Sequence, residues 1–359
     1  MSMQVLLGDR SGRIIAQVKP EIKSVNWRLN EIPQLSMRFS KKDAKVTESN
    51  LQYGNRVLIK FSSDIGLPYW GGVIDPPAEW DESSVTVTAW GIEYLLQFRT
   101  TPKTRAFNDD TVGRILYYTL YEANQDQDMG LYFGSIWGGG RGHSPRYHGK
   151  TVWSIVKDCT TKLERCDIRF IARQDGDFIK FRVDVHEKAG QDNRNKFAFR
   201  EGKNVSEVVL TEQGPIINKF MAIGAGTDWG ESRQHSVHYD RVSDQKYGLR
   251  EASKVYPDVT MESTLIRYAH TEIRDNAEPH TRIALKVGNA RPARFVDYDL
   301  GDVIGCTLPS YGWNGFDAPV RVLAREYDTT KGSCTLVVEE EKFVAPVNVG
   351  WDAVGTSEA

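Results

Sequence analysis

The chain has 359 residues and a nearly balanced charge, with 46 lysines and arginines against 48 aspartates and glutamates. The length predicts about two or three domains, and the charge balance argues against a protein that binds nucleic acid over its whole surface, because phosphate contacts require an excess of basic side chains. Four cysteines without a CxxC pair and the lack of an apolar run long enough to cross a bilayer predict a soluble protein without a disulfide framework, a metal or a cofactor.

The first part of the chain predicts a small β-domain. Apolar and polar residues alternate along short segments, and Gly, Pro, Asn, Asp or Ser residues separate these segments. We interpret residues 1–105 as a first β-barrel domain, which residues 200–226 complete. Its candidate strands include Val25–Leu29, Leu35–Phe39, Val57–Ile59, Gly72–Ile74 and Val85–Ala89.

The period of the sequence changes after residue 105. Apolar residues keep helical spacing from Val112 to Tyr121, behind a candidate capping cluster at Asn108–Asp110. A second helix is expected from Thr151, and the segment 167–185 has the pattern of a β-hairpin with Asp-Gly at its turn. Residues 106–199 are therefore predicted to be an inserted α+β module.

The second half of the chain returns to strand character. A strand is expected within 219–226, followed by a long exposed loop over 227–245 and a helix from Thr260. We interpret residues 227–345 as a second β-barrel domain with this helix before it. Residues 346–359 are aperiodic and contain Gly and Ser, which predicts a C-terminal tail without structure of its own.

Two segments of the chain resemble each other over their whole length. Residues 53–91 align with residues 300–338 without a gap, and the strand and turn signals agree along both. Matched positions include Gly54 and Gly301, Val73 and Val320, Trp80 and Tyr327, and Asp81 and Asp328. A duplicated β-unit indicates a scaffold built by symmetry. The predicted fold class is α+β and β-dominated, with two similar small β-barrel domains flanking an inserted α+β module.

The acidic residues of this repeat have two interpretations. Glu79 and Asp81 recur as Glu326 and Asp328, which is compatible with catalytic acids. Their equivalence at a predicted strand connection favours turn chemistry instead. The chain has neither a GxSxG elbow nor an HExxH motif, so no catalytic residue is predicted. A catalytic pair assembled in three dimensions stays an open alternative.

Two further motifs are weak matches to ligand sites. Residues 144–151 nearly form a phosphate-binding loop, but Ser144 replaces the glycine that makes its tight turn, which favours a plain helix N-terminus. His235, His238 and Asp240 are metal-ligand types that lie close together. A zinc site needs further ligands from a pre-positioned element, so a solvated loop is favoured.

The segment 130–150 interleaves aromatic and basic residues on a glycine-rich loop. Such a loop can stack on nucleic acid or sugar. A loop that packs its own aromatic side chains or meets a neighbouring subunit is the favoured interpretation. The predicted partner or subunit interface consists of Trp137, Arg141, Arg146 and Tyr147 from this loop, together with Tyr311 and Trp313.

The order of these elements resembles the hub proteins of phage tail tips and baseplates, including the amino-terminal portion of tail-associated lysins and related minor tail proteins. The resemblance covers residues 20–345. It is carried by the segments 53–57 and 70–74, 150–185, 199–208 and 218–226, 247–252, 260–275 and 298–303. The chain ends shortly after the second β-copy, where many relatives carry a lysin, peptidase or receptor-binding extension.

The resemblance implies a homotrimeric ring with pseudo-sixfold symmetry, because each subunit contributes two similar barrels. The implied partners are the distal tail protein or tail tube protein, the tape-measure protein and other tail-tip or fibre proteins. DNA would pass through the channel without sequence recognition. The implied location is the tail tip of a virion assembled in the host cytoplasm. The alternatives are a cell-wall hydrolase acting at infection and a carbohydrate-binding tail-tip protein, with Trp137 and Tyr147 as stacking platforms.

Overall fold

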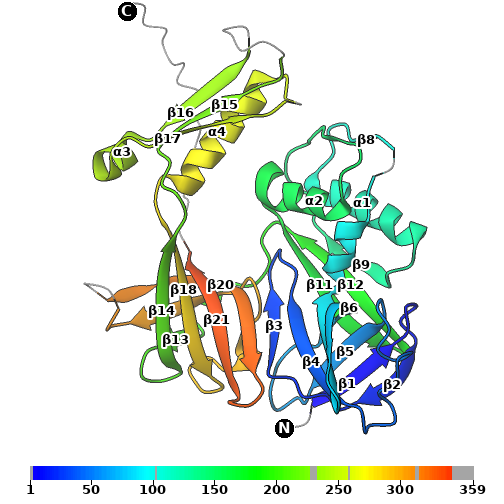
Figure 1. Cartoon of the computed structure of the whole chain (residues 1–359). Helices are drawn as coiled ribbons and strands as arrows, with labels where there is room; N and C mark the ends of the chain where they lie inside the picture. The colour runs from blue at the N-terminus through cyan, green and yellow to red at the C-terminus, as the bar shows by residue number, and fades with distance from the viewer. Residues whose placement is uncertain (1–2, 102, 227–232, 258, 312–314, 342–359) are drawn as a thin grey trace, which may run out of the picture.

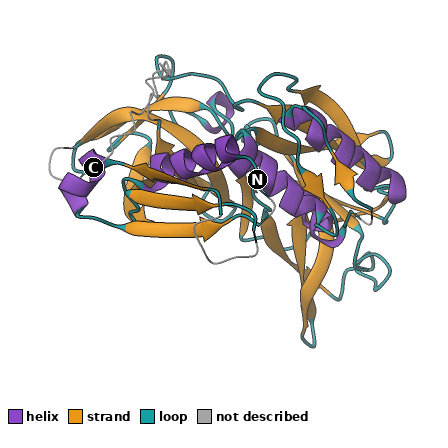
Figure 2. Cartoon of the chain, turned by 90° about the horizontal axis from the view of Figure 1, so that it is seen from above, coloured by secondary structure: helices purple, strands orange, loops and turns teal. Residues whose placement is uncertain are grey.

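The computed structural model describes residues 3–101, 103–226, 233–257, 259–311 and 315–341. Two curled β-sheets stand side by side (Figure 1). A helical module lies above the amino-terminal sheet, and a small α/β unit lies above the carboxyl-terminal sheet. Seen from above, the helices lie over the strands (Figure 2). The fold class is therefore confirmed as α+β and β-dominated.

The first sheet has six strands in the order β2-β1-β5-β6-β7-β4. Along β5, Val57 and Ile59 enter the core shared with the second sheet, while Leu58 enters the core of the helical module. Because alternate residues of a strand point to opposite faces, this continuous apolar run is explained by burial on both faces. The strands are β1 (Met3–Gly8), β2 (Ile14–Val18), β4 (Gln34–Ser40), β5 (Arg56–Phe61), β6 (Trp70–Trp80) and β7 (Ser84–Gly91).

The second sheet has the order β13-β19-β20-β21-β18-β14, and β3 (Ser24–Arg28) pairs with β20. This pairing is antiparallel and joins Val25 to Tyr327. A strand from the first hundred residues is therefore part of the second sheet, and one continuous hydrophobic core contains residues of both sheets. The strands are β13 (Ala198–Arg200), β14 (Val205–Gln213), β18 (His280–Gly288), β19 (Val303–Leu308), β20 (Phe316–Asp328) and β21 (Ser333–Glu340).

This topology corrects the expectation that residues 200–226 complete the first barrel. Within this range, β14 pairs with β18 of the second sheet. The strand that follows, β15 (Lys219–Ile223), pairs with β16 and β17 and belongs to neither large sheet. Strand partners distant in the chain are not specified by local sequence, which explains the error.

The internal repeat is present in the strand order. The order β5-β6-β7-β4 of the first sheet recurs as β19-β20-β21-β18 in the second. The Gly54 amide donates to the Ile74 carbonyl at 2.8 Å, and the Gly301 amide donates to the Val322 carbonyl at 2.8 Å. Both glycines have positive φ angles, 88° and 89°, which favour glycine at this turn.

The strand register shows that the repeat contains insertions. In the first sheet, the Ile74 amide donates to the Asn55 carbonyl, and Ile74 pairs with Ala89 of the next strand. In the second sheet, the Val322 amide donates to the Asp302 carbonyl, and Val322 pairs with Val338. The offset between copies is therefore 247 at Asn55 (302 − 55), 248 at Ile74 (322 − 74) and 249 at Ala89 (338 − 89). The ungapped match of Val73 to Val320 was wrong, because the spacing between matched positions differs by one or two residues between the copies.

The inserted module packs its sheet and helices against the outer face of the first sheet. Helix α1 (Val112–Asp126) buries Val112, Ile115, Leu116 and Leu120, as its spacing predicts, but Tyr121 is exposed. Its N-cap is Thr111 without a side-chain cap, so the predicted capping cluster does not cap it. The other elements are 3-10 helix η1 (Ile92–Phe98), β8 (Arg105–Ala106), β9 (Leu131–Ile136), β10 (Arg146–Tyr147), α2 (Val152–Lys157), π-helix η2 (Asp158–Leu163), β11 (Asp167–Asp175) and β12 (Phe178–His186).

The small α/β unit was not predicted as a unit. Helix α4 (Glu262–Asn276) covers one face of the sheet β16-β15-β17 and buries Leu265, Ala269 and Ile273. The strands β16 (His235–Tyr239) and β17 (Glu251–Val255) and the helix α3 (Arg241–Tyr247) complete it. A long exposed loop was expected over 227–245, but β16 lies within this range and α3 begins within it. No helix in the described part of the chain is long and apolar enough to cross a membrane.

One buried carboxyl group predicts a pH dependence of stability. Glu93 of η1 is buried, and this burial raises its pKa from 4.5 to about 8. The folded state therefore holds a proton that the unfolded state loses between these values, so stability falls as the pH rises from about 5 to 8, by up to about 5 kcal/mol. Urea unfolding of Glu93→Gln across this range is expected to show a flatter pH profile than the native chain. Glu82→Gln, at an exposed position, is the control, and an unchanged profile in Glu93→Gln contradicts the assignment.

Candidate functional site

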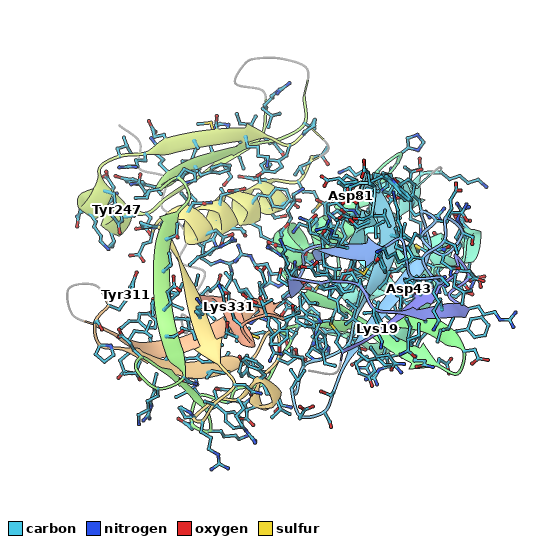
Figure 3. The ribbon with its side chains drawn as sticks, turned by 60° about the horizontal axis from the view of Figure 1, so that its bottom comes forward. Lys19, Asp43, Asp81, Tyr247, Tyr311 and Lys331 are labelled. Atoms are coloured by element: carbon cyan, nitrogen blue, oxygen red, sulfur yellow. The ribbon has the colours of Figure 1, made fainter. Side chains whose placement is uncertain are left out.

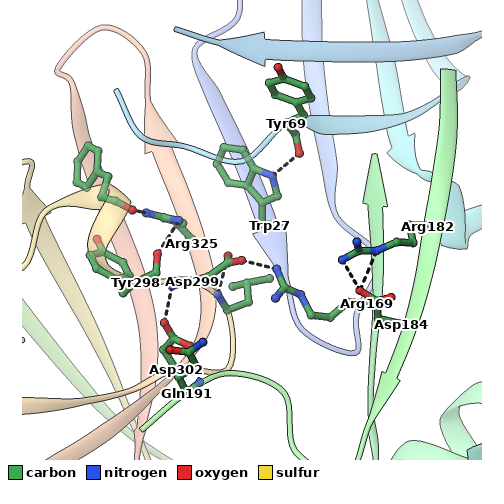
Figure 4. A network of polar contacts seen from close by, with 12 residues as sticks. Trp27, Tyr69, Arg169, Arg182, Asp184, Gln191, Tyr298, Asp299, Asp302 and Arg325 are labelled. Atoms are coloured by element: carbon green, nitrogen blue, oxygen red, sulfur yellow. Dashed lines mark hydrogen bonds and ion pairs between the residues drawn. The ribbon is translucent and has the colours of Figure 1, made fainter. Parts of the chain in front are cut away.

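Buried polar groups meet at a junction of five chain segments. We define the junction as Asn30, Asp167, the linker 189–193, the turn 299–302 and Arg321. These segments come from the end of β3, the start of β11, the connection from the module to β13, the turn before β19, and β20. Part of this network is drawn in Figure 4. It therefore joins the module to both large sheets.

Asp167 is the central acceptor of the junction. Its Oδ1 accepts from Asn30 Nδ2 at 2.8 Å, and its Oδ2 accepts from the Ala189 amide at 2.7 Å. The same carboxylate forms an ion pair with Arg321, and the two side chains are only 5% and 13% exposed. Arg321 also donates to the carbonyl oxygens of Gly301 and Ala189. A buried ion pair of this kind fixes the relative position of its two side chains. Separating them would leave a buried charge without a partner, which strongly destabilises the folded state.

A second set of contacts holds the linker to the turn before β19. Asp302 accepts from the Gln191 amide at 2.7 Å and from the Asp299 amide at 2.9 Å. Burial raises the pKa of Asp302, although these amide donors act in the opposite direction. Arg169 of β11 donates to Asp299 at 2.5 Å. The module therefore contacts this turn through both its sheet and its carboxyl-terminal linker.

The linker and the turn approach so closely that side chains are excluded. A Cβ atom on Gly190 would lie 2.1 Å from the carbonyl carbon of Gly301, and one on Gly301 would lie 2.4 Å from the Ala189 oxygen. Both glycines have positive φ angles, 92° and 89°. Glycine is required here for close approach as well as for backbone conformation.

Two buried arginines outside the junction also donate hydrogen bonds to backbone carbonyls. Arg325 of β20 donates to the carbonyls of Tyr298 and Phe295, and its guanidinium carbon lies 4.6 Å from the centroid of the Tyr298 ring. Arg56 of β5 donates to the Ile179 and Asp128 carbonyls of the module, and burial lowers the pKa of Arg56. The Arg56 contacts join the first sheet to the module, whereas the Arg325 contacts hold β20 to the β18–β19 connection of the same sheet.

The polar groups of the junction bind one another and so have a structural role. Its carboxylates accept from amides and guanidinium groups of the same chain, and its arginines donate to carboxylates and carbonyls. In the described residues, no group of three or more His, Cys, Asp or Glu side chains is placed to hold a metal ion.

The loop residues of the predicted interface are held against the module. Tyr147 is buried at 3% exposure and packs edge-on against Phe107, and burial raises its pKa. Its predicted role as a stacking platform was therefore wrong. Trp137 is partly buried in the module core. Arg141 and Arg146 are exposed, and the Arg141 amide donates to Glu164 at 2.7 Å.

The other two predicted interface residues lie far from this loop in the sequence. Tyr311 is partly buried against the shared core, in the connection between β19 and β20. Trp313 lies outside the described residues. Tyr311 packs against the shared core of the two sheets, whereas Tyr147 lies in the core of the module and Trp137 packs against it.

The weak ligand motifs form local structure. At residues 144–151, the Thr151 hydroxyl accepts from the Ser154 amide and caps α2, as a plain helix N-terminus requires. Asp240 caps α3 by accepting from the amides of Val242 and Ser243. His238 lies against His270 of α4, with ring centroids 4.8 Å apart, so it faces the helix and is not in a solvated loop.

The repeated acidic turns were correctly interpreted as turn chemistry. Asp81 accepts from the amides of Ser83 and Ser84 at 2.7 and 2.6 Å. Asp328 accepts from the amides of Thr330 and Lys331, both at 2.9 Å. Hydrogen bonds from the Ser84 hydroxyl to Asp81 and from the Thr330 hydroxyl to Asp328, together with these amide bonds, lower the pKa of both aspartates.

The junction itself could not be found from the sequence. Its residues are single polar positions spread from Asn30 to Arg321, and their convergence depends on non-local strand pairing. The one usable signal was Gly301, which the repeat placed at the turn before a strand.

The chain matches no protein-family model. It also matches no curated protein. Similar folds are found among solved structures. The 43 kDa tail protein of prophage MuSo2 from Shewanella oneidensis is 14% identical with a TM-score of 0.62, over 94% of this chain and 98% of that one. A tail protein from Neisseria meningitidis MC58 is 12% identical with a TM-score of 0.61, over 95% and 97%.

The prophage tail protein gp18 from Listeria monocytogenes EGD-e is 14% identical with a TM-score of 0.57, over 95% of each chain. The chain therefore has the fold of prophage tail proteins along nearly its whole length. The resemblance inferred from the sequence is confirmed at the level of this fold.

The junction predicts that replacing the two aspartates at opposite ends of β11 lowers the free energy of unfolding by very different amounts. Asp167→Asn at the start of β11 leaves Arg321 buried without its charge partner, and we expect a loss of about 3 to 5 kcal/mol in the free energy of unfolding. Asp175→Asn at the end of β11 removes an ion pair to Lys180 whose side chains are 65% and 40% exposed, and we expect a much smaller loss, because water screens an exposed pair. Urea denaturation followed by circular dichroism measures both. Equal losses in the two variants contradict a stabilising role for the junction.

Proposed function

We propose that the chain is a structural hub protein of a phage tail tip or baseplate. The observation that carries the proposal is the four-stranded order found twice in one chain, within a fold shared with two prophage tail proteins and a further tail protein. Three chains of this kind supply six similar units, which reconciles threefold with sixfold symmetry. The chain then forms a homotrimeric ring with pseudo-sixfold symmetry.

In this proposal the ring joins the tail tube protein or distal tail protein to the tip. It surrounds the channel through which the tape-measure protein and DNA leave, and it contacts other tail-tip or fibre proteins at its rim. The exposed residues Arg141 and Arg146 remain proposed contacts with a partner or subunit. The role is mechanical and not catalytic, and the buried polar junction keeps the two sheets of each subunit in one orientation.

The ring predicts a defined stoichiometry. Native mass spectrometry and mass photometry of the purified chain at micromolar concentration are expected to give three times the mass of one chain. Negative-stain images should show a ring with six lobes. A monomer that tail partners leave unchanged contradicts the proposal. Release of soluble fragments from purified peptidoglycan favours a cell-wall hydrolase instead.

The proposed location is tested on assembled particles. Gold-labelled antibodies against the chain are expected to bind at one end of the tail of the virus that encodes it, distal to the head. Label along the whole tail, or only on particles without tails, contradicts a tip or baseplate position. Antibodies against the major capsid protein of the same particles are the control.

A further inference from the structure

The two copies of the repeat differ at one matched aromatic position. Trp80 of β6 pairs across the sheet with Val85, as Tyr327 of β20 pairs with Cys334. Trp80 is 61% exposed, whereas Tyr327 is 1% exposed. A position that belongs to the core in one copy therefore lies on the surface in the other.

In the second copy, aromatic rings cover this position. Phe295 lies in the connection from β18 to β19, residues 289–302, and its ring packs edge-on against Tyr327 at 6.0 Å between centroids. The Phe61 ring packs against Tyr327 at 5.9 Å. Phe295 is 1% exposed and belongs to the shared hydrophobic core. The connection from β18 to β19 thus places a six-membered ring beside the matched aromatic.

In the first copy, the equivalent place is a hollow. The connection from β4 to β5, residues 41–55, has Tyr53 as its only aromatic residue, and Tyr53 does not line the hollow. The hollow has a volume of about 250 Å³. Its apolar lining consists of Val46, Leu51, Trp80 and Val85. The first unit therefore leaves open the place that a phenyl ring fills in the second.

The lining of the hollow also contains polar groups. Lys41, Thr47 and Glu48 line it and are exposed. The Lys41 ammonium lies 5.7 Å from the centroid of the Trp80 ring and donates to the Asp81 carbonyl, which holds it beside the indole. An ammonium donates hydrogen bonds, a carboxylate accepts them, and a hydroxyl does both. Because the lining holds one cation and one anion, it has no net charge with which to select a charged ligand.

Hydrogen bonds within the chain hold the walls of the hollow in place. Asn55 is 3% exposed, and its side-chain amide donates to the carbonyls of Ser49 and Asn50 at 2.8 and 3.1 Å. The Lys41 amide donates to the Ser83 carbonyl at 2.9 Å, which ties the connection to the β6–β7 turn. A site that is formed in advance loses less conformational entropy when it binds a ligand.

The hollow lies away from the α/β unit. Asp43 of the 41–55 connection and Asp81, the residue after Trp80, lie in the half of the molecule opposite to Tyr247 of α3 (Figure 3). Among the described residues, none from the α/β unit lines the hollow. The α/β unit therefore leaves the site open to a ligand from outside.

We propose that the hollow beside Trp80 binds one neutral pyranose residue of a glycan. A pyranose is a six-membered ring, as is the phenyl ring that fills the equivalent place in the second unit. Its C–H groups suit the indole and the apolar lining, and its hydroxyls donate to Glu48 and accept from Lys41. A phenyl ring of a partner protein would bind neither polar group. This inference goes beyond the proposed ring and does not rest on it, because one chain supplies the whole lining.

Saturation-transfer difference NMR on the full chain tests the site. The probes are methyl α-glucoside, methyl β-galactoside, methyl α-mannoside and N-acetylglucosamine, each alone and within an oligosaccharide. At least one probe is expected to bind through its ring protons. Trp80→Ala is expected to weaken this binding about tenfold, because the sugar loses its aromatic platform. Glu48→Ala is expected to act in the same direction, and Trp80→Phe should retain part of the affinity.

Phe98→Ala is the matched control, because Phe98 is 63% exposed and does not line the hollow. This variant is expected to bind the probes as the native chain does, and thermal unfolding shows whether each variant keeps its fold. Binding that Trp80→Ala leaves unchanged overturns the site, and a lack of binding by every probe overturns the ligand class. A trimer that Trp80→Ala dissociates, without sugar binding by the native chain, assigns the hollow to a neighbouring protein. The mass of the native oligomer tests the ring separately.

Discussion

The pairing of β3 with β20 is the interaction on which the rest of the architecture depends. It places a strand from the first thirty residues inside a sheet whose other members come after residue 197. Because the strand carries Val25 and Trp27 into the shared core, the two sheets do not have separate interiors. The ion pair of Asp167 with Arg321 and the packing of the Phe61 ring against Tyr327 both involve β20, the strand with which β3 pairs.

Local patterns predicted the elements of the molecule well. Helix α1 and the β11–β12 hairpin were found from apolar spacing and from an Asp-Gly turn, and both are stabilised largely by neighbours in sequence. The repeat was recognised because its turns keep the same residues, such as Gly54 and Gly301. Local patterns failed where partners are distant. The assignment of residues 200–226 to the first sheet was wrong, since nothing in β14 itself specifies β18 as its partner.

The distance in sequence between interacting residues also explains which site residues could be predicted. Asp81 and Asp328 act on amides two and three residues away, so their role could be inferred from the sequence. Asn30, Asp167 and Arg321 act on one another across the whole chain, so their role could not. Tyr147 was misassigned because an aromatic residue in a glycine-rich loop has the same sequence signature whether it faces solvent or, as here, the core of the module.

The small α/β unit has a core of its own, formed by residues such as Phe220, Leu265 and Ile273, that does not merge with either of the other cores. It is inserted between β14 and β18, which are adjacent strands of one sheet, so the chain leaves the sheet and returns to the same place. Residues that are buried in one core unfold together as a cooperative unit. The two large sheets therefore form one unit that opens together, whereas the α/β unit can open alone. Opening of this unit breaks the ion pair between Asp275 of α4 and Arg165 of the module, and leaves the core shared by the two sheets intact.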